Sequence, residues 1–184
     1  PARSVFKLEE IDRRVGLLKS GQHVVDLGAA PGSWSLYVAG RIGDAGRLLS
    51  VDIKPIEGGF PPNTTVLQAD ALALDGTLHE RFAPYDVVLS DMAPNTSGDK
   101  FQNAARSFEL FQAALAVAER YGSPRSHFVG KIFMGEDFEV ARRAVGANYS
   151  RALVIRPPAT RKNSVEVFLV GVEKKAGIPK QPGS

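Results

Sequence analysis

Short apolar runs alternate with stretches of helical periodicity along most of the chain, and this alternation restricts the possible folds more than any other feature. The apolar runs are typical of buried strands, and the stretches between them repeat apolar residues every three or four positions. We predict strands over residues 22–27, 47–52, 64–68, 85–90, 127–133, 151–156 and 165–172. We predict helices over residues 4–18, with Ser4 as the N-cap, and over 33–42, 74–82, 104–121 and 138–147.

This order predicts an α/β fold in which a mostly parallel seven-stranded sheet carries helices on both faces. The last two strands follow one another without a helix between them, so one of them should run antiparallel near an edge. A chain of 184 residues can form one domain with a buried core, but it is too short for two ordinary domains. We expect a single domain over residues 1–175, followed by a flexible tail over 176–184.

Composition excludes several classes of site. The chain has no cysteine and only three isolated histidines, so we expect neither a disulfide nor a bound metal. We also expect a cytoplasmic protein without a membrane partner, because no apolar run approaches the ~20 residues that cross a bilayer. The net charge of +3 is mildly basic. Its clusters near both ends and over residues 151–162 fit an RNA-binding surface and an ordinary solvated surface equally well.

A glycine turn over residues 26–34 follows the first predicted strand and opens a helix. Ligands of open α/β sheets bind beside such turns, because glycine allows a close approach to the backbone. The dinucleotide fingerprint would place glycines at positions 28, 30 and 33, and of these only Gly28 is present. A P-loop is excluded because no Gly-Lys-Ser/Thr sequence ends the turn. The turn therefore suits a nucleoside cofactor without a pyrophosphate.

Acidic residues end the first three predicted strands, at Asp26, Asp52 and Asp70. We expect Asp26 to accept from an amino group of the cofactor, Asp52 to accept from its ribose hydroxyls and Asp70 to accept from its adenine amino group. Each of the three could equally cap the turn or helix that follows it. Trp34 lies one turn into the helix after the glycine turn, where it could wall the cofactor or belong to the core.

Five motifs follow one another along nearly the whole chain: Phe6-Lys7-Leu8, Val25-Asp26-Leu27-Gly28-Ala29-Ala30-Pro31-Gly32, Ser90-Asp91-Met92-Ala93-Pro94-Asn95, Phe128-Val129-Gly130-Lys131-Ile132-Phe133 and Arg161-Lys162-Asn163-Ser164-Val165-Glu166-Val167-Phe168. Together they resemble the motifs of the FtsJ-like ribosomal RNA 2′-O-methyltransferases. The resemblance implies a Rossmann-like class I methyltransferase fold with S-adenosylmethionine as the cofactor. We expect this cofactor to contact Asp26, Gly28, Ala30, Pro31, Gly32, Trp34, Asp52, Asp70 and Asp91.

The resemblance also implies a catalytic tetrad formed by Lys7, Asp91, Lys131 and Glu166. A ribose 2′-hydroxyl is a poor nucleophile until a base removes its proton, and a lysine can serve as that base if its pKa falls toward neutrality. Burial and the neighbouring Lys7 would lower the pKa of Lys131. Asp91 would oppose that shift and orient the amine, with Glu166 holding the array. A lone lysine at this position would otherwise be an edge residue reaching solvent.

The chain departs from the family pattern at a few positions. Ser33 and Gly130 replace a common glycine and a common apolar residue, and residues 123–126 replace a Gly-Gly turn. Typical members also carry a longer basic segment before the lead helix, so either this chain is trimmed or its RNA contacts are reduced.

The resemblance implies methylation of a uridine in large-subunit ribosomal RNA, within a ribosomal particle and by a monomer. Two alternatives stay open at this point. The same tetrad occurs in enzymes that methylate tRNA or messenger-RNA caps, and a non-catalytic RNA-binding ribosome-assembly factor could retain the fold.

Overall fold

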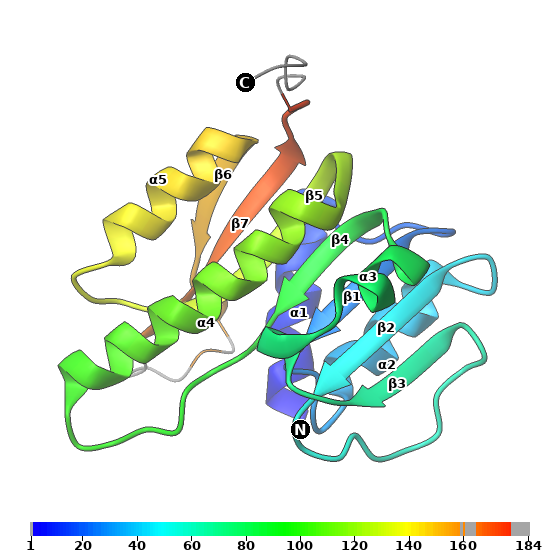
Figure 1. The fold of residues 1–184 in the computed structure, drawn as a ribbon, viewed down its shortest axis with the longest axis horizontal. Helices are drawn as coiled ribbons and strands as arrows, with labels where there is room; N and C mark the ends of the chain where they lie inside the picture. The colour runs from blue at the N-terminus through cyan, green and yellow to red at the C-terminus, as the bar shows by residue number, and fades with distance from the viewer. Residues whose placement is uncertain (1, 159, 161–164, 178–184) are drawn as a thin grey trace.

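The structure of the chain is a computed structural model that describes residues 2–158, 160 and 165–177 (Figure 1). Residues 161–164 of the last family motif and most of the predicted tail, residues 178–184, lie outside the described residues.

Seven strands form one sheet in the described part of the chain, in the order β3-β2-β1-β4-β5-β7-β6. The strands are β1 (His23–Leu27), β2 (Arg47–Asp52), β3 (Thr64–Gln68), β4 (Tyr85–Ser90), β5 (Gly122–Phe133), β6 (Tyr149–Ile155) and β7 (Glu166–Lys174). Neighbours from β3 to β5 pair in parallel, whereas β7 is antiparallel to both β5 and β6. The predicted α/β class and the single antiparallel strand near an edge are therefore confirmed.

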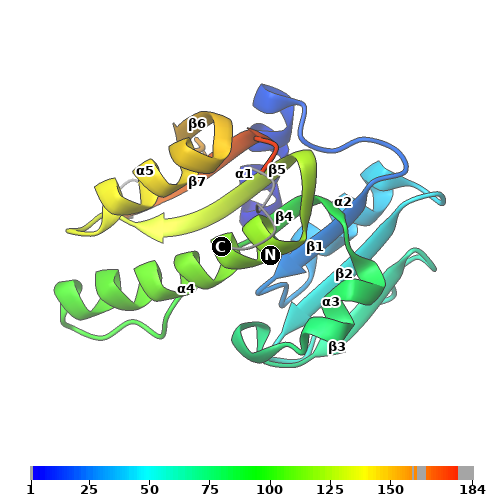
Figure 2. The ribbon, with the colours of Figure 1, turned by 45° about the horizontal axis from the view of Figure 1, so that its top comes forward.

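Helices cover both faces of the sheet, as the alternation predicts. The helices are α1 (Ala2–Val15), α2 (Ser33–Ile42), α3 (Gly76–Phe82), α4 (Lys100–Tyr121) and α5 (Phe138–Asn148), with a short 3₁₀ helix η1 (Ala71–Ala73). Figures 1 and 2 show α4 and α5 on one face and α1 and α2 on the other. Each face has its own core: Phe111 and Phe128 are buried on the α4 side, and Leu8 and Ile11 on the α1 side.

The lead helix begins two residues before the expected N-cap, so Ser4 lies inside α1 and the capping prediction is wrong. The helix also ends three residues early, because Gly16 adopts the left-handed conformation at φ 63°. The buried Asp12 stabilises the turn that follows, since its carboxylate accepts from the Leu18 backbone N–H at 2.8 Å.

The helix predicted over residues 74–82 forms as α3, which begins at Gly76, and a separate 3₁₀ helix that was not predicted, η1, precedes it. Two aspartates start these two helices. Asp70 accepts from the Leu72 N–H and caps η1, and Asp75 accepts from the Thr77 N–H and caps α3. A third aspartate has the same effect on α4, which begins four residues earlier than expected. There Asp99 accepts from two backbone N–H groups of the first turn.

Among the described residues, no helix combines the length and the apolar character that crossing a membrane would require.

Candidate active site

A pocket of about 520 Å³ opens where the carboxyl ends of β1, β2 and β4 meet. We call it the strand-end pocket. The glycine turn and the strand ends contribute five predicted cofactor residues to its lining: Gly28, Ala30, Asp52, Asp70 and Asp91. Parallel strands bring these positions together because their carboxyl ends meet at one edge of the sheet.

Glycine is required at the first position of the turn. Gly28 has φ 78°, and a Cβ there would lie 2.6 Å from Cγ of Met92. Asp52 holds the turn in place, because its carboxylate accepts from the backbone N–H groups of Ala30 and Lys54, both at 2.8 Å. Each carboxylate oxygen keeps a further lone pair for a ligand hydroxyl. Asp52 can therefore shape the pocket and bind a ligand at once.

Asp70 combines the two roles that the sequence left open. Its side chain caps η1, and it also lines the strand-end pocket. Pro31 and Gly32 do not line that pocket. A Cβ on Gly32 would lie 3.0 Å from the Phe60 ring, so this glycine permits close packing of the loop after β2.

Two predicted cofactor residues lie in the interior instead of the pocket. Asp26 is 0% exposed and accepts a hydrogen bond from the Ser35 hydroxyl at 2.7 Å. Burial raises the pKa of Asp26 to about 7. Trp34 is 2% exposed, packs against Phe168 and donates its indole N–H to the carbonyl of Ser4 at 2.8 Å. Direct cofactor contacts from Asp26 and Trp34 therefore find no support in this geometry.

Two apolar side chains that no sequence motif indicated, Ile53 and Leu72, line the same pocket. Ile53 is 65% exposed and Leu72 is 53% exposed. Ile53 directly follows Asp52, and Leu72 lies two residues after Asp70. These positions beside acidic strand ends are the sequence signal that could have indicated the two side chains. Exposed aliphatic side chains beside carboxylates suit a flat ring that carries polar edges.

The four tetrad residues form one connected group. Nζ of Lys131 lies 2.8 Å from Oδ1 of Asp91 and 3.4 Å from Oε2 of Glu166, and the Lys7 ammonium forms an ion pair with Glu166. They come from α1, the end of β4, β5 and the start of β7. Since β7 runs antiparallel, Glu166 pairs with Phe133 at the end of β5 and so reaches the same edge.

Burial and the neighbouring carboxylates have opposite effects on the charge of Lys131. Burial lowers the pKa of Lys131, but Asp91 and Glu166 outweigh it, so the net pKa is raised above the ordinary lysine value. The predicted opposition between burial and Asp91 is therefore present, and the two carboxylates decide its outcome. Burial raises the pKa of Asp91 despite the nearby Lys131. Burial acts in the same direction on Glu166, but Lys131 and Lys7 lower its pKa overall.

A chain of contacts joins the helix after the glycine turn to the tetrad. The Trp34 indole N–H donates to the Ser4 carbonyl, and the Ser4 hydroxyl donates to Oδ2 of Asp91 at 3.4 Å. Asp91 also lines the strand-end pocket, so it touches both the lysine pair and the space for a ligand. The arrangement places a lysine amine beside a ligand pocket, with carboxylates that control its charge.

Solved structures share this fold. A ribosomal RNA methyltransferase from Plasmodium falciparum superposes with a TM-score of 0.82 at 22% identity, over 95% of this chain and 98% of that one. Aeropyrum pernix fibrillarin in complex with S-adenosylmethionine superposes with a TM-score of 0.62 at 14% identity, over 92% of this chain and 76% of that one. At these identities the likeness shows a class I methyltransferase fold.

Curated relatives are much more similar in sequence. The ribosomal RNA large subunit methyltransferase E of Sorangium cellulosum is 61% identical over 176 residues, which are 96% of this chain and 83% of the relative. The protein of the same name from Oleidesulfovibrio alaskensis is 46% identical, over 97% of this chain and 87% of the relative. The family model of the FtsJ-like methyltransferases matches residues 1–174. This chain belongs to the FtsJ-like methyltransferase family.

Proposed function

We propose that this protein transfers a methyl group from S-adenosylmethionine to a ribose 2′-hydroxyl of large-subunit ribosomal RNA. The observation that carries the proposal is the connected Lys7, Glu166, Lys131 and Asp91 group beside the strand-end pocket. The relatives named ribosomal RNA large subunit methyltransferase E, which match nearly all of this chain, supply the substrate class.

The strand-end pocket fits S-adenosylmethionine better than a dinucleotide. Asp52, Asp70 and Asp91 line it, and these carboxylates would repel a pyrophosphate but accept from hydroxyl and amino groups. Asp52 is suited to the ribose hydroxyls and Asp70 to the adenine amino group. Ile53 and Leu72 offer apolar contacts for the adenine ring. The bound cofactor supplies a methyl group on a sulfonium cation, which suits an acidic pocket.

Lys131 is the general base in this proposal. The 2′-oxygen gives its proton to Nζ of Lys131 and forms the new bond to the methyl carbon as the bond from that carbon to sulfur breaks. Asp91 and Glu166 hold the amine in place. Lys131 must first lose its own proton. Because Asp91 also faces the pocket, a cation bound there would offset the negative charge that holds the proton on Lys131 and lower its pKa.

The finer points of the proposal rest on the family resemblance. They are a uridine target, a substrate presented within a ribosomal particle, one domain over residues 1–175 and action as a monomer in the cytoplasm. Comparing free RNA with ribosomal subunits tests the ribosomal particle as substrate, and the mass of the protein in solution tests the monomer.

The deciding experiment measures transfer of labelled methyl groups to ribosomal RNA, tRNA and capped RNA, and then maps 2′-O-methylated nucleotides. We expect label in large-subunit ribosomal RNA and a single ribose-methylated nucleotide that is absent without the protein. Label only in tRNA or in the cap would reassign the substrate. Binding to ribosomal RNA without any transfer would favour the non-catalytic assembly factor.

A further inference from the structure

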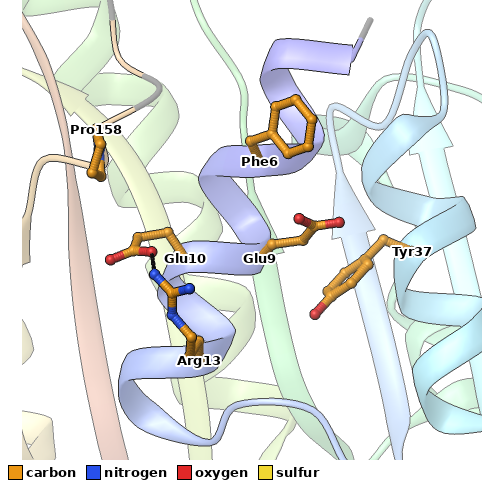
Figure 3. Close-up of a pocket in the computed structure, with 6 residues that line it drawn as sticks. All are labelled: Phe6, Glu9, Glu10, Arg13, Tyr37 and Pro158. Carbon is orange, nitrogen blue, oxygen red and sulfur yellow. Dashed lines mark hydrogen bonds and ion pairs between the residues drawn. The ribbon is translucent and has the colours of Figure 1, made fainter.

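A second pocket, of about 620 Å³, lies along the outer face of α1 (Figure 3). We call it the α1 groove. Its lining residues are Phe6, Glu9, Glu10, Arg13, Tyr37 and Pro158. None of them lines the strand-end pocket, so the two cavities are separate sites.

The α1 groove begins beside the tetrad. Phe6 directly precedes Lys7, whose ammonium pairs with Glu166, and Ser4 in the same turn of helix contacts Asp91. From Phe6 to Arg13 the helix rises by about 10 Å, which sets the distance over which the groove leads away from the tetrad. A strand of RNA whose target ribose lies at Lys131 therefore has a neighbouring nucleotide within reach of the groove.

The side chains of the groove suit a nucleobase. The Phe6 ring is 53% exposed, although α1 buries Leu8 and Ile11 completely on its opposite side. An aromatic ring left in solvent beside an active site offers a stacking face, and stacking on such rings is a common way to hold unpaired RNA bases.

The two acidic residues of the groove differ in what they are free to bind. Glu10 forms ion pairs with Arg13 and Arg14. The Glu9 carboxylate makes no hydrogen bond or ion pair with any described residue, and its position three residues after Phe6 places it next to that ring on the helix. Figure 3 shows the Phe6 ring, the Glu9 carboxylate and Tyr37 on the same side of the helix.

We propose that the α1 groove binds the base of a nucleotide adjacent to the methylated one, stacked on Phe6, with its amino group donating to Glu9. The proposal rests on the proposed function. A carboxylate would repel phosphates but accepts from an N–H, so the ligand is the base and not the backbone. Cytosine, adenine and guanine carry an amino group, whereas the N3–H of uracil lies between two carbonyl oxygens that a carboxylate repels. The groove therefore selects an amino-bearing base beside the target ribose.

The first test combines Phe6 variants with RNA that lacks a base beside the methylated nucleotide. With intact RNA, Phe6→Ala should raise KM about tenfold, leaving kcat and cofactor affinity unchanged, and Phe6→Trp should restore KM because it keeps a stacking face. With abasic RNA, the KM of the wild-type protein should rise by the same factor, and Phe6→Ala should cause no further rise. Val140→Ala, which removes an exposed apolar side chain from α5, is the control and should behave as wild type.

The second test concerns the identity of the neighbouring base. The wild-type protein should prefer substrates with cytosine, adenine or guanine at that position over uracil. Glu9→Gln should reduce this preference, because an amide can donate to uracil as well as accept from an amino group. Glu80→Gln, an exposed carboxylate on α3, is the matched control.

The same RNAs are also measured by equilibrium binding, so that the test does not depend on turnover. The groove proposal would be overturned if Phe6→Ala weakened binding and raised KM equally on intact and abasic RNA. It would also be overturned if Phe6→Ala left KM and the binding constant for intact RNA unchanged. A wild-type protein that methylates none of the RNAs would refute the proposed function. Weaker binding by Phe6→Ala, confined to RNA with the base present, would still support the groove in that case.

Discussion

The charge of the Lys131 amine decides whether it can accept a proton from a ribose hydroxyl. Asp91 and Glu166 outweigh burial and raise the pKa of Lys131, so the unprotonated fraction at neutral pH is small and increases about tenfold with each pH unit below that pKa. We predict that kcat rises with pH across the neutral and mildly alkaline range, as measured by initial rates of labelled methyl transfer. A flat profile of single-turnover rates, together with an unshifted profile for Glu166→Gln, would exclude Lys131 as the base.

Glu166→Gln provides a check on the sign of this effect. The substitution removes a negative charge 3.4 Å from Nζ of Lys131, which disfavours the ammonium form and lowers the pKa of Lys131. The rising limb of the pH profile should therefore move to lower pH, even if the maximal rate falls. A limb that moves to higher pH would contradict the assigned role of this carboxylate.

Two alanine variants should separate the chemical step from cofactor binding. Lys131→Ala should reduce methyl transfer at least about a hundredfold and leave the cofactor Kd nearly unchanged, because Lys131 does not line the strand-end pocket. Asp52→Ala should weaken cofactor binding about tenfold or more, because it loses contacts to the ligand and releases the Ala30 N–H. Calorimetric titration and single-turnover rates measure the two effects. Loss of both properties in Lys131→Ala, with the fold intact, would refute the assignment.

At the scale of single elements, sequence periodicity shows which residues face the sheet but not which neighbours they meet. The ranges of α2 and β2 match their predictions because their apolar patterns are regular. Trp34 was open to two interpretations, since the choice depends on α1 packing over α2, which no local pattern encodes. The tetrad could be identified from its motifs. The pKa of Lys131 could not be predicted, because its direction depends on distances to Asp91 and Glu166.

Gly130 shows why a departure from the family pattern can be required by local packing. A Cβ at this position of β5 would lie 2.7 Å from ring atoms of both Phe111 and Phe128. We predict that Gly130→Ala lowers the free energy of unfolding by about 1–3 kcal/mol, because neither buried ring can move away without disturbing the core. Urea denaturation measures the change.

Gly40→Ala is the matched control for that prediction. Gly40 lies in α2, where an added Cβ would meet no neighbouring atom within 4 Å, and its φ is not positive. The same substitution should here stabilise the protein by about 0.5–1 kcal/mol, because alanine favours the helix. Equal effects at the two positions would show that packing around Gly130 does not explain its identity.

At the scale of the whole molecule, the direction of one strand assembles the site. Glu166 begins β7 and reaches Lys131 because β7 is antiparallel to β5. A parallel strand would place its first residue at the opposite edge of the sheet. The absence of a helix between the last two predicted strands indicated this reversal, so the global arrangement was more predictable than the contacts within the site.

Asp26 links the stability of the whole fold to pH, because it lies in the inner strand β1 and meets solvent only when the sheet opens. Its pKa rises from 3.8 to about 7 in the folded protein, and Oδ1 has no hydrogen-bond partner among the described residues. Between those values the unfolded chain has lost this proton while the folded chain keeps it. Increasing pH therefore favours unfolding, by about 1.4 kcal/mol per pH unit and about 4 kcal/mol in total.

Asp26→Asn should remove this contribution, because the amide stays neutral and can still accept from the Ser35 hydroxyl. We predict that the variant and the wild-type protein have similar free energies of unfolding near pH 4, and that the variant becomes increasingly more stable up to about pH 7. Urea denaturation across this pH range measures the free energy of unfolding of both proteins. The titration of all other groups cancels in the difference between them. A difference that stays constant with pH would mean that Asp26 is ionised in the folded protein. The buried carboxylate would then need a compensating cation, and none of the described residues forms an ion pair with it.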